Sequence, residues 1–255
     1  MSHTLCVIPI SHYCEIARWA LQVSEKDFTE KQALPGLHLV LLPSRPDGKK
    51  LTPYMKKPDG TWLLDSWSIL EYCEIGEPVP DDIKDVLNKD VGVCIRAIVY
   101  SHILYSDALS EMLSNASYGQ KISWALVGRL IMREIGRGIV KSPEHINNCE
   151  DRLKAARLFL EDKLGLNRDQ VERDFALTPT AIAVCSLFCP IVNAENYIYG
   201  SGFHLPEISH FPPSMKQCVS EQQATPLGKY VIEMYKIHRQ NKAPLNALAS
   251  GKLKN

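Results

Sequence analysis

The stretch LCVIPISHYCEIARWAL, residues 5–21, changes its hydrophobic period at Ser11. Residues 5–10 are almost purely apolar, which predicts a short strand buried on both faces. After Ser11, apolar side chains recur every three or four residues, which predicts a helix. Ser11 therefore lies at the N-terminus of the helix, where the first amide hydrogens lack intrahelical partners and where the helix dipole has its positive end. N-capping alone explains a serine there, so a chemical role for its hydroxyl needs further support.

Length and charge exclude several classes of protein. The 255 residues are enough for one large domain or two small ones, each with a core. The 29 basic residues balance the 29 acidic ones, and no basic run interleaves with aromatic residues. Nucleic acids and anionic membrane surfaces are therefore expected to be poor partners. The longest apolar run, residues 181–192, is too short to span a membrane, and the N-terminus lacks the pattern of a signal peptide.

The cysteines indicate a reducing environment. Eight cysteines occur singly, without a CxxC pair and without a Cys/His cluster that has zinc spacing. Most of them fall on apolar faces of the expected helices and strands. We therefore expect a cytoplasmic protein with buried free thiols and no metal site.

The residues that follow the first helix predict a small mixed sheet. Residues 27–32 form a second expected strand with Phe28 inward, and residues 33–43 an expected loop with at most one or two helical turns. Two strand-like runs, 52–56 and 61–64, flank the turn sequence Lys-Pro-Asp-Gly, which favours a hairpin. A further helix is expected to begin directly after this hairpin. The order strand, helix, strand, hairpin, helix is typical of a sheet covered by helices.

Two features of this region point to ligand binding. Pro53 cannot donate to a sheet ladder, so it fits the first position of its strand. If the Thr52–Pro53 bond is cis, which sequence does not decide, the backbone of Thr52 turns outward and can pair with an extended ligand. Asp65 and Ser66 begin the helix after the hairpin. A carboxylate there can hold an ammonium group, and a hydroxyl with free helix amides can hold a carboxylate, although N-capping is again an alternative.

Together these fragments resemble the glutathione transferase superfamily, whose N-terminal domain has a thioredoxin-like fold. The resemblance rests on four fragments in the right order: Ser11–Leu21, Leu34–His38, Thr52–Met55 and Leu64–Leu70. It implies that Pro53 is cis, that the Thr52 backbone pairs with the cysteinyl part of glutathione, and that Asp65 and Ser66 hold the γ-glutamyl end. It also places Ser11 where the superfamily keeps a Ser, Cys or Tyr beside the glutathione sulfur.

The second half of the chain is expected to be helical. Residues 76–82 are proline-rich and polar, as in a linker, and no convincing strand follows residue 83. Two helices are expected over 83–114 and 123–140. Three more begin with a hydroxyl cap followed by proline, at Ser142-Pro143, Thr178-Pro179 and Thr225-Pro226. The helix after Pro179 is apolar nearly all round and should be central.

This second half resembles the helical C-terminal bundle of the superfamily, and residues 178–200 and 224–239 look like its bacterial-type members. We therefore predict an α/β domain plus an all-α domain. A thioredoxin-like, glutathione-binding domain should span residues 1–77, followed by a linker at 78–82 and an all-helical domain at 83–255. Because many members are dimers, a homodimer is expected.

The resemblance implies that glutathione is a co-substrate whose sulfur attacks a small hydrophobic electrophile. A free thiol with a pKa near ~8.5 is mostly protonated at neutral pH. A hydrogen bond from Ser11 and the helix dipole could together lower that pKa by roughly one to two units. Ser11 is therefore the candidate catalytic residue, as a hydrogen-bond donor and not as a nucleophile.

Two alternatives remain open. Cys14 could support glutathione-dependent thiol-disulfide reduction, or the chain could be a binding or scaffold protein that has lost turnover. His12 is expected to be exposed on the first helical turn. Four apolar positions near the expected electrophile site are each explained by core packing as well, so none is assigned a role: Tyr13, Tyr105, Met112 and Trp124.

Overall fold

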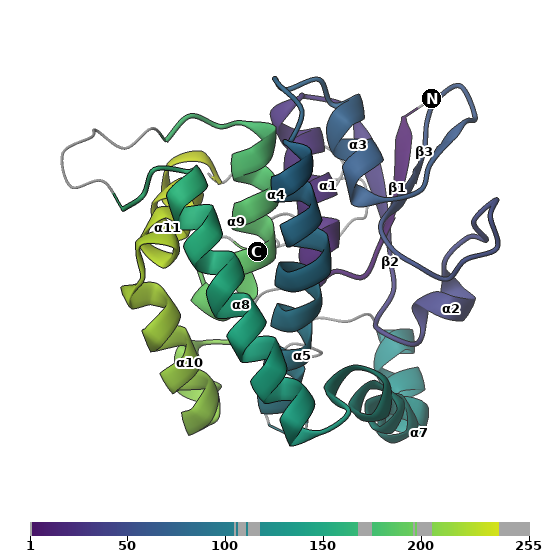
Figure 1. Cartoon of the computed structure of the whole chain (residues 1–255). Coiled ribbons are helices and arrows are strands. Elements are labelled where there is room, and N and C mark those ends of the chain that lie inside the picture. The colour runs from purple at the N-terminus through teal and green to yellow at the C-terminus, as the bar shows by residue number, and fades with distance from the viewer. Residues whose placement is uncertain are drawn as a thin grey trace, which may run out of the picture.

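The N-terminal part of the chain forms a four-stranded mixed sheet, and the rest is helical (Figure 1). The computed structural model describes residues 2–104, 106, 111, 118–167, 175–195, 197 and 206–239. In the sheet, β1 pairs in parallel with β2 and antiparallel with β3, which pairs antiparallel with β4. The strands in spatial order are β2 (Phe28–Gln32), β1 (His3–Val7), β3 (Tyr54–Lys56) and β4 (Trp62–Leu63). The predicted fold class, a thioredoxin-like domain followed by a helical bundle, is confirmed.

The first strand lies earlier in the chain than predicted. The apolar run was expected to be extended over residues 5–10, but β1 ends at Val7. Pro9 has no amide hydrogen to donate, and the amide of Ser11 donates to the carbonyl of Ile8 at 3.1 Å. Residues 8–10 therefore form a turn, which delivers the chain into helix α1 (His12–Val23).

Most other expectations for the sheet domain are confirmed, although β3 begins at Tyr54 and Pro53, expected as the first residue of that strand, directly precedes it. Phe28 begins β2 with its side chain buried, and the loop after β2 contains the single short helix α2 (His38–Leu41). The hairpin of β3 and β4 turns through Gly60, whose φ of +88° is accessible to glycine without strain. Helix α3 (Ser66–Tyr72) follows directly, with Asp65 as its N-cap.

Two π-helical turns occur among the first helices of the helical half. The segment predicted as one helix from residue 83 is α4 (Asp81–Val86), a π-helical turn at Leu87–Val91, and α5 (Gly92–Ile103). Of the rest of that predicted helix, residues 105, 107–110 and 112–114 lie outside the described residues. The next helix, α7 (Tyr118–Ile135), starts five residues earlier than predicted and ends in a π-helical turn at Gly136–Val140.

The three predicted hydroxyl-proline helix starts are confirmed. The side chains of Ser142, Thr178 and Thr225 each accept a hydrogen bond from the amide three residues later. These residues cap α8 (Pro143–Lys163), α9 (Pro179–Val192) and α11 (Pro226–His238). One helix that the sequence analysis did not predict, α10 (Pro213–Ala224), precedes α11 and also has proline at its first position.

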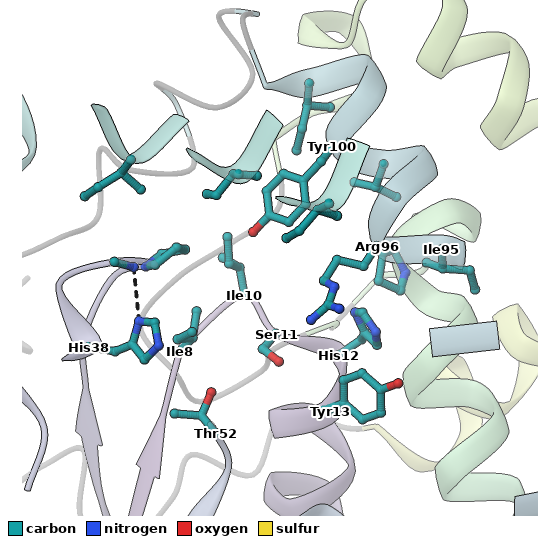
Figure 2. A pocket seen from close by; sticks show the side chains of 18 of the residues that line it. Ile8, Ile10, Ser11, His12, Tyr13, His38, Thr52, Ile95, Arg96 and Tyr100 are labelled. Atoms are coloured by element: carbon teal, nitrogen blue, oxygen red, sulfur yellow. Dashed lines mark hydrogen bonds between the residues drawn. The ribbon is translucent and has the colours of Figure 1, made fainter. Parts of the chain in front are cut away.

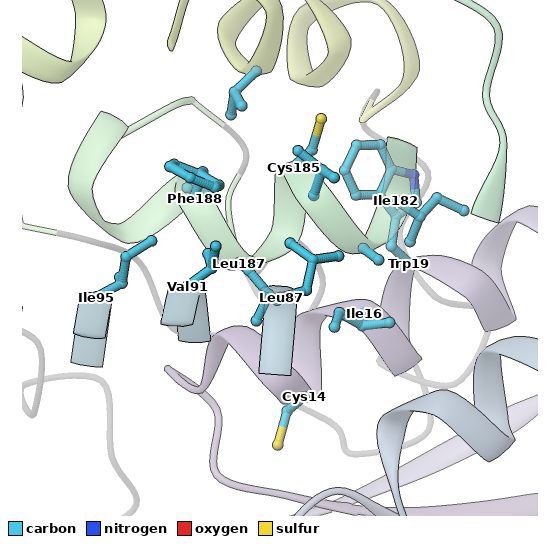
Figure 3. Close-up of a cluster of buried hydrophobic side chains, with 14 of the residues drawn as sticks. Cys14, Ile16, Trp19, Leu87, Val91, Ile95, Ile182, Cys185, Leu187 and Phe188 are labelled. Carbon is cyan, nitrogen blue, oxygen red and sulfur yellow. The ribbon is translucent and has the colours of Figure 1, made fainter. Parts of the chain in front are cut away.

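The core runs through both halves of the chain around α9. Nearly every side chain of α9 is buried, so the helix is central as predicted. Figure 3 shows α9 lying against α1, with Ile182 of α9 beside Trp19 of α1. Because the same buried cluster includes residues of the sheet and of α11, the two halves share one hydrophobic core. The boundaries at residues 77 and 83 stay a prediction.

A buried ion network joins α1 to the sheet and to the end of α11. The guanidinium of Arg18 contacts Glu15 at 2.7 Å and Glu30 of β2 at 2.6 Å. Glu15 also accepts from Arg239 at 2.9 Å. Glu15 and Arg18 are fully buried, and a buried charge is tolerated only when it is paired in this way. The network therefore fixes the orientation of α1.

The cysteines are all free, and seven of the eight are buried. In the described ranges, no three His, Cys, Asp or Glu side chains gather closely enough to hold a metal ion. None of the described helices is both long and apolar enough to cross a membrane.

Candidate functional site

Sheet register brings three of the predicted site segments to one edge. Cys6, near the end of β1, lies opposite Tyr54 at the start of β3. Met55 of β3 in turn lies opposite Leu63 at the end of β4. The chain leaving β1, the chain entering β3 and the chain leaving β4 therefore meet at the same edge. These are the segments that carry Ser11, Thr52–Pro53 and Asp65–Ser66.

A cavity of about 590 Å³ opens at this edge, between the sheet domain and helices α5 and α7. Ser11 and Thr52 line it, and Figure 2 shows both side chains beside the cavity, with Ile8 and Ile10 from the turn after β1. Pro53, Asp65 and Ser66 do not line it. The structure thus brings two of the five predicted site residues into the cavity wall and leaves three at the same sheet edge outside that wall.

Ser11 caps α1 and still has a proton to donate. Its Oγ accepts a hydrogen bond from the amide of Cys14 at 3.4 Å, with backbone angles in the extended region. A hydroxyl has two lone pairs and one hydrogen, so N-capping occupies a lone pair and does not use the O–H. That O–H also interacts with the Cys14 thiol, and it can donate to a ligand sulfur in exchange for this contact. The capping alternative and a role as hydrogen-bond donor are therefore compatible at this residue.

Thr52 lines the cavity, and its backbone groups are unpaired among the described residues. The Thr52–Pro53 bond is cis, as the sequence analysis expected from the resemblance. Within the part of the chain that the structure describes, the backbone N–H and C=O of Thr52 form no hydrogen bond. Both groups are therefore available to an extended ligand lying along this edge.

Asp65 and Ser66 differ in exposure. The Asp65 carboxylate is exposed and accepts a hydrogen bond from the amide of Ser68 at 2.7 Å, which completes a capping box with the Ser68 hydroxyl. Ser66, by contrast, is only 3% exposed. The Asp65 carboxylate can therefore accept a further hydrogen bond from a ligand in solvent. The Ser66 side chain is covered, so a ligand at this position contacts mainly the free amides at the start of α3.

Cys14 is buried beneath the site. Its side chain is fully covered, and it does not line the cavity. Burial raises the pKa of the Cys14 thiol, although hydrogen bonds with Ser11 and Thr52 act in the opposite direction. Because the thiolate is the reactive form, a covered thiol with a raised pKa is a poor nucleophile.

The prediction that His12 is exposed is wrong. His12 is 6% exposed, and its Nε2 donates to the carbonyl of Gly92 at 3.1 Å. Burial, and secondarily the charge of Arg96, lowers the pKa of His12 to about 3, so the ring is neutral at physiological pH. The cause is the packing of α5 over the first turn of α1, which the hydrophobic pattern of α1 alone does not reveal.

Sequence reasoning also missed a cation beside Ser11. Arg96 lines the cavity from α5, and Figure 2 shows its guanidinium extending toward Ser11 and His12. It is exposed and forms no ion pair with any carboxylate in the described ranges. The signal was present in the sequence, because Arg96 is the single Arg, Lys, Asp or Glu within the apolar segment Gly92–Ile103.

The remaining wall of the cavity is largely apolar. Tyr13 lines it, as does Tyr100, and burial raises the pKa of both phenols, so they stay neutral. Trp124 does not line it, and Tyr105 and Met112 lie outside the described residues. Aliphatic and aromatic side chains from the helical half complete the wall: Ile95, Val99, Ile103, Leu130, Ile131, Ile135, Ile139, Phe211 and Met215. The cavity can therefore hold an apolar molecule next to the Ser11 hydroxyl and the Arg96 charge.

Comparison with known proteins gives one family match and several similar folds. The family described as "Glutathione S-transferase, N-terminal domain" matches residues 5–79. Two glutathione transferases from Phanerochaete chrysosporium, GSTFuA2 and GSTFuA3, each align with 95% of this chain at 11% identity. Their TM-scores are 0.56 and 0.55, over 100% and 98% of their own chains, and at this identity the likeness shows the fold alone.

A third solved structure is less similar. Glutaredoxin 2 from Salmonella typhimurium, in complex with glutathione, has a TM-score of 0.46 at 15% identity, with 91% of this chain and 99% of that one covered. A likeness at this level carries no argument about binding. No curated protein sequence matches the chain.

Proposed function

We propose that this chain, whose residues 5–79 match the N-terminal domain of glutathione S-transferases and whose fold is similar to theirs, binds glutathione and stabilises the thiolate for attack on a small hydrophobic electrophile. The observation that carries this proposal is the shared cavity. Ser11 and Thr52 line one end of it, and apolar side chains of the helical half line the rest. One cavity can therefore hold a thiol donor and an apolar acceptor in contact.

In this proposal, glutathione lies along the sheet edge that Ser11, Thr52 and Asp65 share. The free backbone groups of Thr52 pair with the cysteinyl residue, and the amides at the start of α3, with Asp65 and Ser66, hold the γ-glutamyl end. The exposed carboxylate of Asp65 supports this role, since it can accept an ammonium group from solvent. Pro53 contributes by shaping the backbone at Thr52.

The chemical step needs thiolate and gains little from a protein nucleophile. The thiol proton leaves to solvent, the sulfur forms a bond to the electrophilic carbon, and a leaving group departs or a double bond accepts the electron pair. The Ser11 hydroxyl donates to the sulfur, and the N-terminus of α1 adds a favourable field. The Arg96 guanidinium supplies further positive charge at this end of the cavity.

Calorimetric titration with glutathione and an S-alkyl glutathione tests the proposal. We expect Asp65→Ala to weaken the binding of both ligands, because the ammonium group loses its carboxylate. Ser11→Ala should leave the affinity for the S-alkyl derivative nearly unchanged, because that ligand has no thiol. Asp81→Ala, which removes another exposed carboxylate near a helix start, is the matched control and should bind like wild type. Equal affinity in all four proteins, or no binding, contradicts the site.

The alternative reaction through Cys14 has less support. A fully covered thiol with a raised pKa must become exposed before it can exchange with a disulfide. Reduction of a small disulfide that is lost in Cys14→Ser and kept in Ser11→Ala would establish that reaction instead. Glutathione binding without any turnover would favour the scaffold alternative. The homodimer and the cytoplasmic location stay predictions, and sedimentation analysis tests the first.

A further inference from the structure

Helix α7 leaves an apolar ridge exposed. Tyr118, Ile122, Leu126 and Leu130 lie four residues apart and therefore share one face of the helix. All four are exposed, Tyr118 by 78% and Leu126 by 79%. We call these four residues the ridge. Large apolar side chains that are contiguous and exposed mark a surface that binds another molecule or a membrane.

Basic side chains share the exposed side of α7 with the ridge. Lys121, Arg129, Arg133 and Arg137 are all exposed, and we call them the flank. Residues 118–141 contain five basic residues and one acidic residue, Glu134, which pairs with Arg133 and Arg137 at 3.3 Å each. At 100° per residue, Arg129 and Arg133 fall at the same helical angles as the ridge, so apolar and basic side chains are mixed on one exposed face of α7. A surface that combines exposed apolar and basic side chains can bind the interface of an anionic membrane.

The ridge continues onto the neighbouring helix α2. On α2, Leu39, Val40 and Leu41 are exposed, Val40 by 81%. In the loop between α2 and β3, Leu51, Lys49 and Lys50 are exposed as well. The two helices are close, since a Cβ on Gly36 would lie 2.7 Å from the Ile131 side chain, and Figure 1 places α7 directly below α2. Leu39, Leu51 and Leu130 also line the cavity, so they form its rim. We call the ridge, its flank and these residues of α2 and the loop after it the rim patch.

The orientation of α7 is fixed by contacts on its other side. The Gln120 side chain accepts a hydrogen bond from the amide of Leu34 at 3.0 Å. Ile131 packs against Gly36, and both Ile131 and Trp124 pack against the core. The helix is thus held to the sheet domain by its inner face, and the ridge points away from the protein.

Charge decides between the candidate occupants of the rim patch. A second copy of this chain, docked by the same face, would bring one basic flank against another, and juxtaposed like charges are unfavourable. Nucleic acid would pair with the flank but would leave the ridge in contact with phosphates. An anionic lipid surface fits both parts, because acyl chains take the ridge and lipid phosphates take the flank.

We propose that the rim patch docks on an anionic lipid surface, with the mouth of the cavity facing the lipid. The balanced charge of the whole chain led to the opposite expectation, that anionic membrane surfaces are poor partners. The local charge of residues 118–141 is strongly positive, because the acidic residues that balance it lie in other parts of the sequence. The inference goes beyond the proposed reaction and does not depend on glutathione binding.

Sedimentation of the full chain with vesicles tests this inference. Vesicles of equal parts phosphatidylcholine and phosphatidylserine should bind wild type, and phosphatidylcholine vesicles should not. The double variant Lys121→Gln/Arg129→Gln should bind about twenty-five-fold less tightly, at roughly fivefold for each cation near the surface. Its matched control is Lys154→Gln/Lys229→Gln, which removes two exposed cations from α8 and α11. The control should bind like wild type.

A second variant tests the ridge. Ile122→Ser/Leu126→Ser should reduce vesicle binding by at least about tenfold, because the apolar anchor is lost. Leu158→Ser, at an exposed leucine of α8, is its control. Circular dichroism should show the same helix content and thermal midpoint in all variants. Three results overturn the proposal: no binding to the anionic vesicles, equal binding to both vesicle types, or a wild-type dimer that Ile122→Ser/Leu126→Ser dissociates.

Discussion

The Nε2 atom of His12 donates to the carbonyl oxygen of Gly92 over 3.1 Å, although 80 residues separate them in the chain. This hydrogen bond joins the first turn of α1, next to Ser11, to the first turn of α5. The edge that carries the candidate catalytic hydroxyl is therefore positioned by the helical half as well as by the sheet. Changes at this junction should affect stability and the cavity together.

Stability should fall at acidic pH because of His12. Its pKa is about 3 in the folded protein and about 6.5 when unfolded, so between these values the unfolded state binds more protons. The contribution of neutral His12 to the free energy of unfolding is complete above about pH 6.5. It is lost as the pH falls toward 3, by up to ~1.4 kcal/mol per pH unit. Urea unfolding at neutral and mildly acidic pH measures this loss.

His12→Gln should remove most of that pH dependence, while the control His145→Gln should retain it. An equal loss of stability with falling pH in wild type and in His12→Gln would show that His12 is not the titrating group.

Gly92 should tolerate no side chain. A Cβ there would lie 2.1 Å from the hydroxyl oxygen of Tyr13, which lines the cavity. We expect Gly92→Ala to lower the free energy of unfolding by about 1–3 kcal/mol, because overpacking forces Tyr13 to move. Combined with Tyr13→Ala it should cost less than the sum of the two changes, because the clash is then absent.

Thermal and urea unfolding measure both effects. Gly119→Ala, in a helix with nothing within 4 Å of the new Cβ, is the control and should be neutral or slightly stabilising. Strict additivity of Gly92→Ala and Tyr13→Ala would contradict the assigned clash.

The ion network at Glu15 should be far more important for stability than a surface pair. Glu15→Ala removes one carboxylate partner from each of the buried guanidinium groups of Arg18 and Arg239. Breaking a buried ion pair in this way should lower the free energy of unfolding by about 3 kcal/mol or more. Glu71→Ala breaks an exposed pair with Lys84, whose atoms are a similar 2.9 Å apart, and should cost less than about 1 kcal/mol. Similar losses in chemical denaturation for both variants would refute the buried network.

Arg96 should favour thiolate in the cavity. A cation beside the sulfur stabilises the charged form, so Arg96→Gln should raise the pKa of bound glutathione by about half a unit. The effect should shrink as salt is added, because Arg96 is exposed. The control Arg129→Gln removes an exposed charge outside the cavity lining and should leave this pKa unchanged. The same shift in both variants would mean that only the overall charge of the protein matters.

The sequence predicted those parts of the fold that depend on local pattern. The hairpin around Gly60, the caps at Ser142, Thr178 and Thr225, and the central α9 each follow from residues close together in the chain. The first strand was misplaced because an apolar run does not show where Pro9 will break the ladder.

The candidate site was predictable only where it is built from local signals. Ser11 and Thr52 were found because helix starts and proline positions are visible in sequence, and the sheet brings them together. The burial of His12 depends on a contact between segments 80 residues apart, which no local period encodes. Arg96 stands out as a lone charge in an apolar helix, but its position beside Ser11 likewise depends on the folded chain. The charges of Glu15 and Arg239 likewise meet only in the folded chain.

The pKa of the glutathione thiol bound to the protein tests the central claim most directly. The ultraviolet absorbance of thiolate, followed against pH, gives this value for wild type, Ser11→Ala and Cys14→Ser. We predict a pKa roughly one to two units below the free value of ~8.5 in wild type and in Cys14→Ser, and a return toward the free value in Ser11→Ala. An unshifted pKa in wild type, or the same depressed pKa in Ser11→Ala, would contradict the role assigned to Ser11.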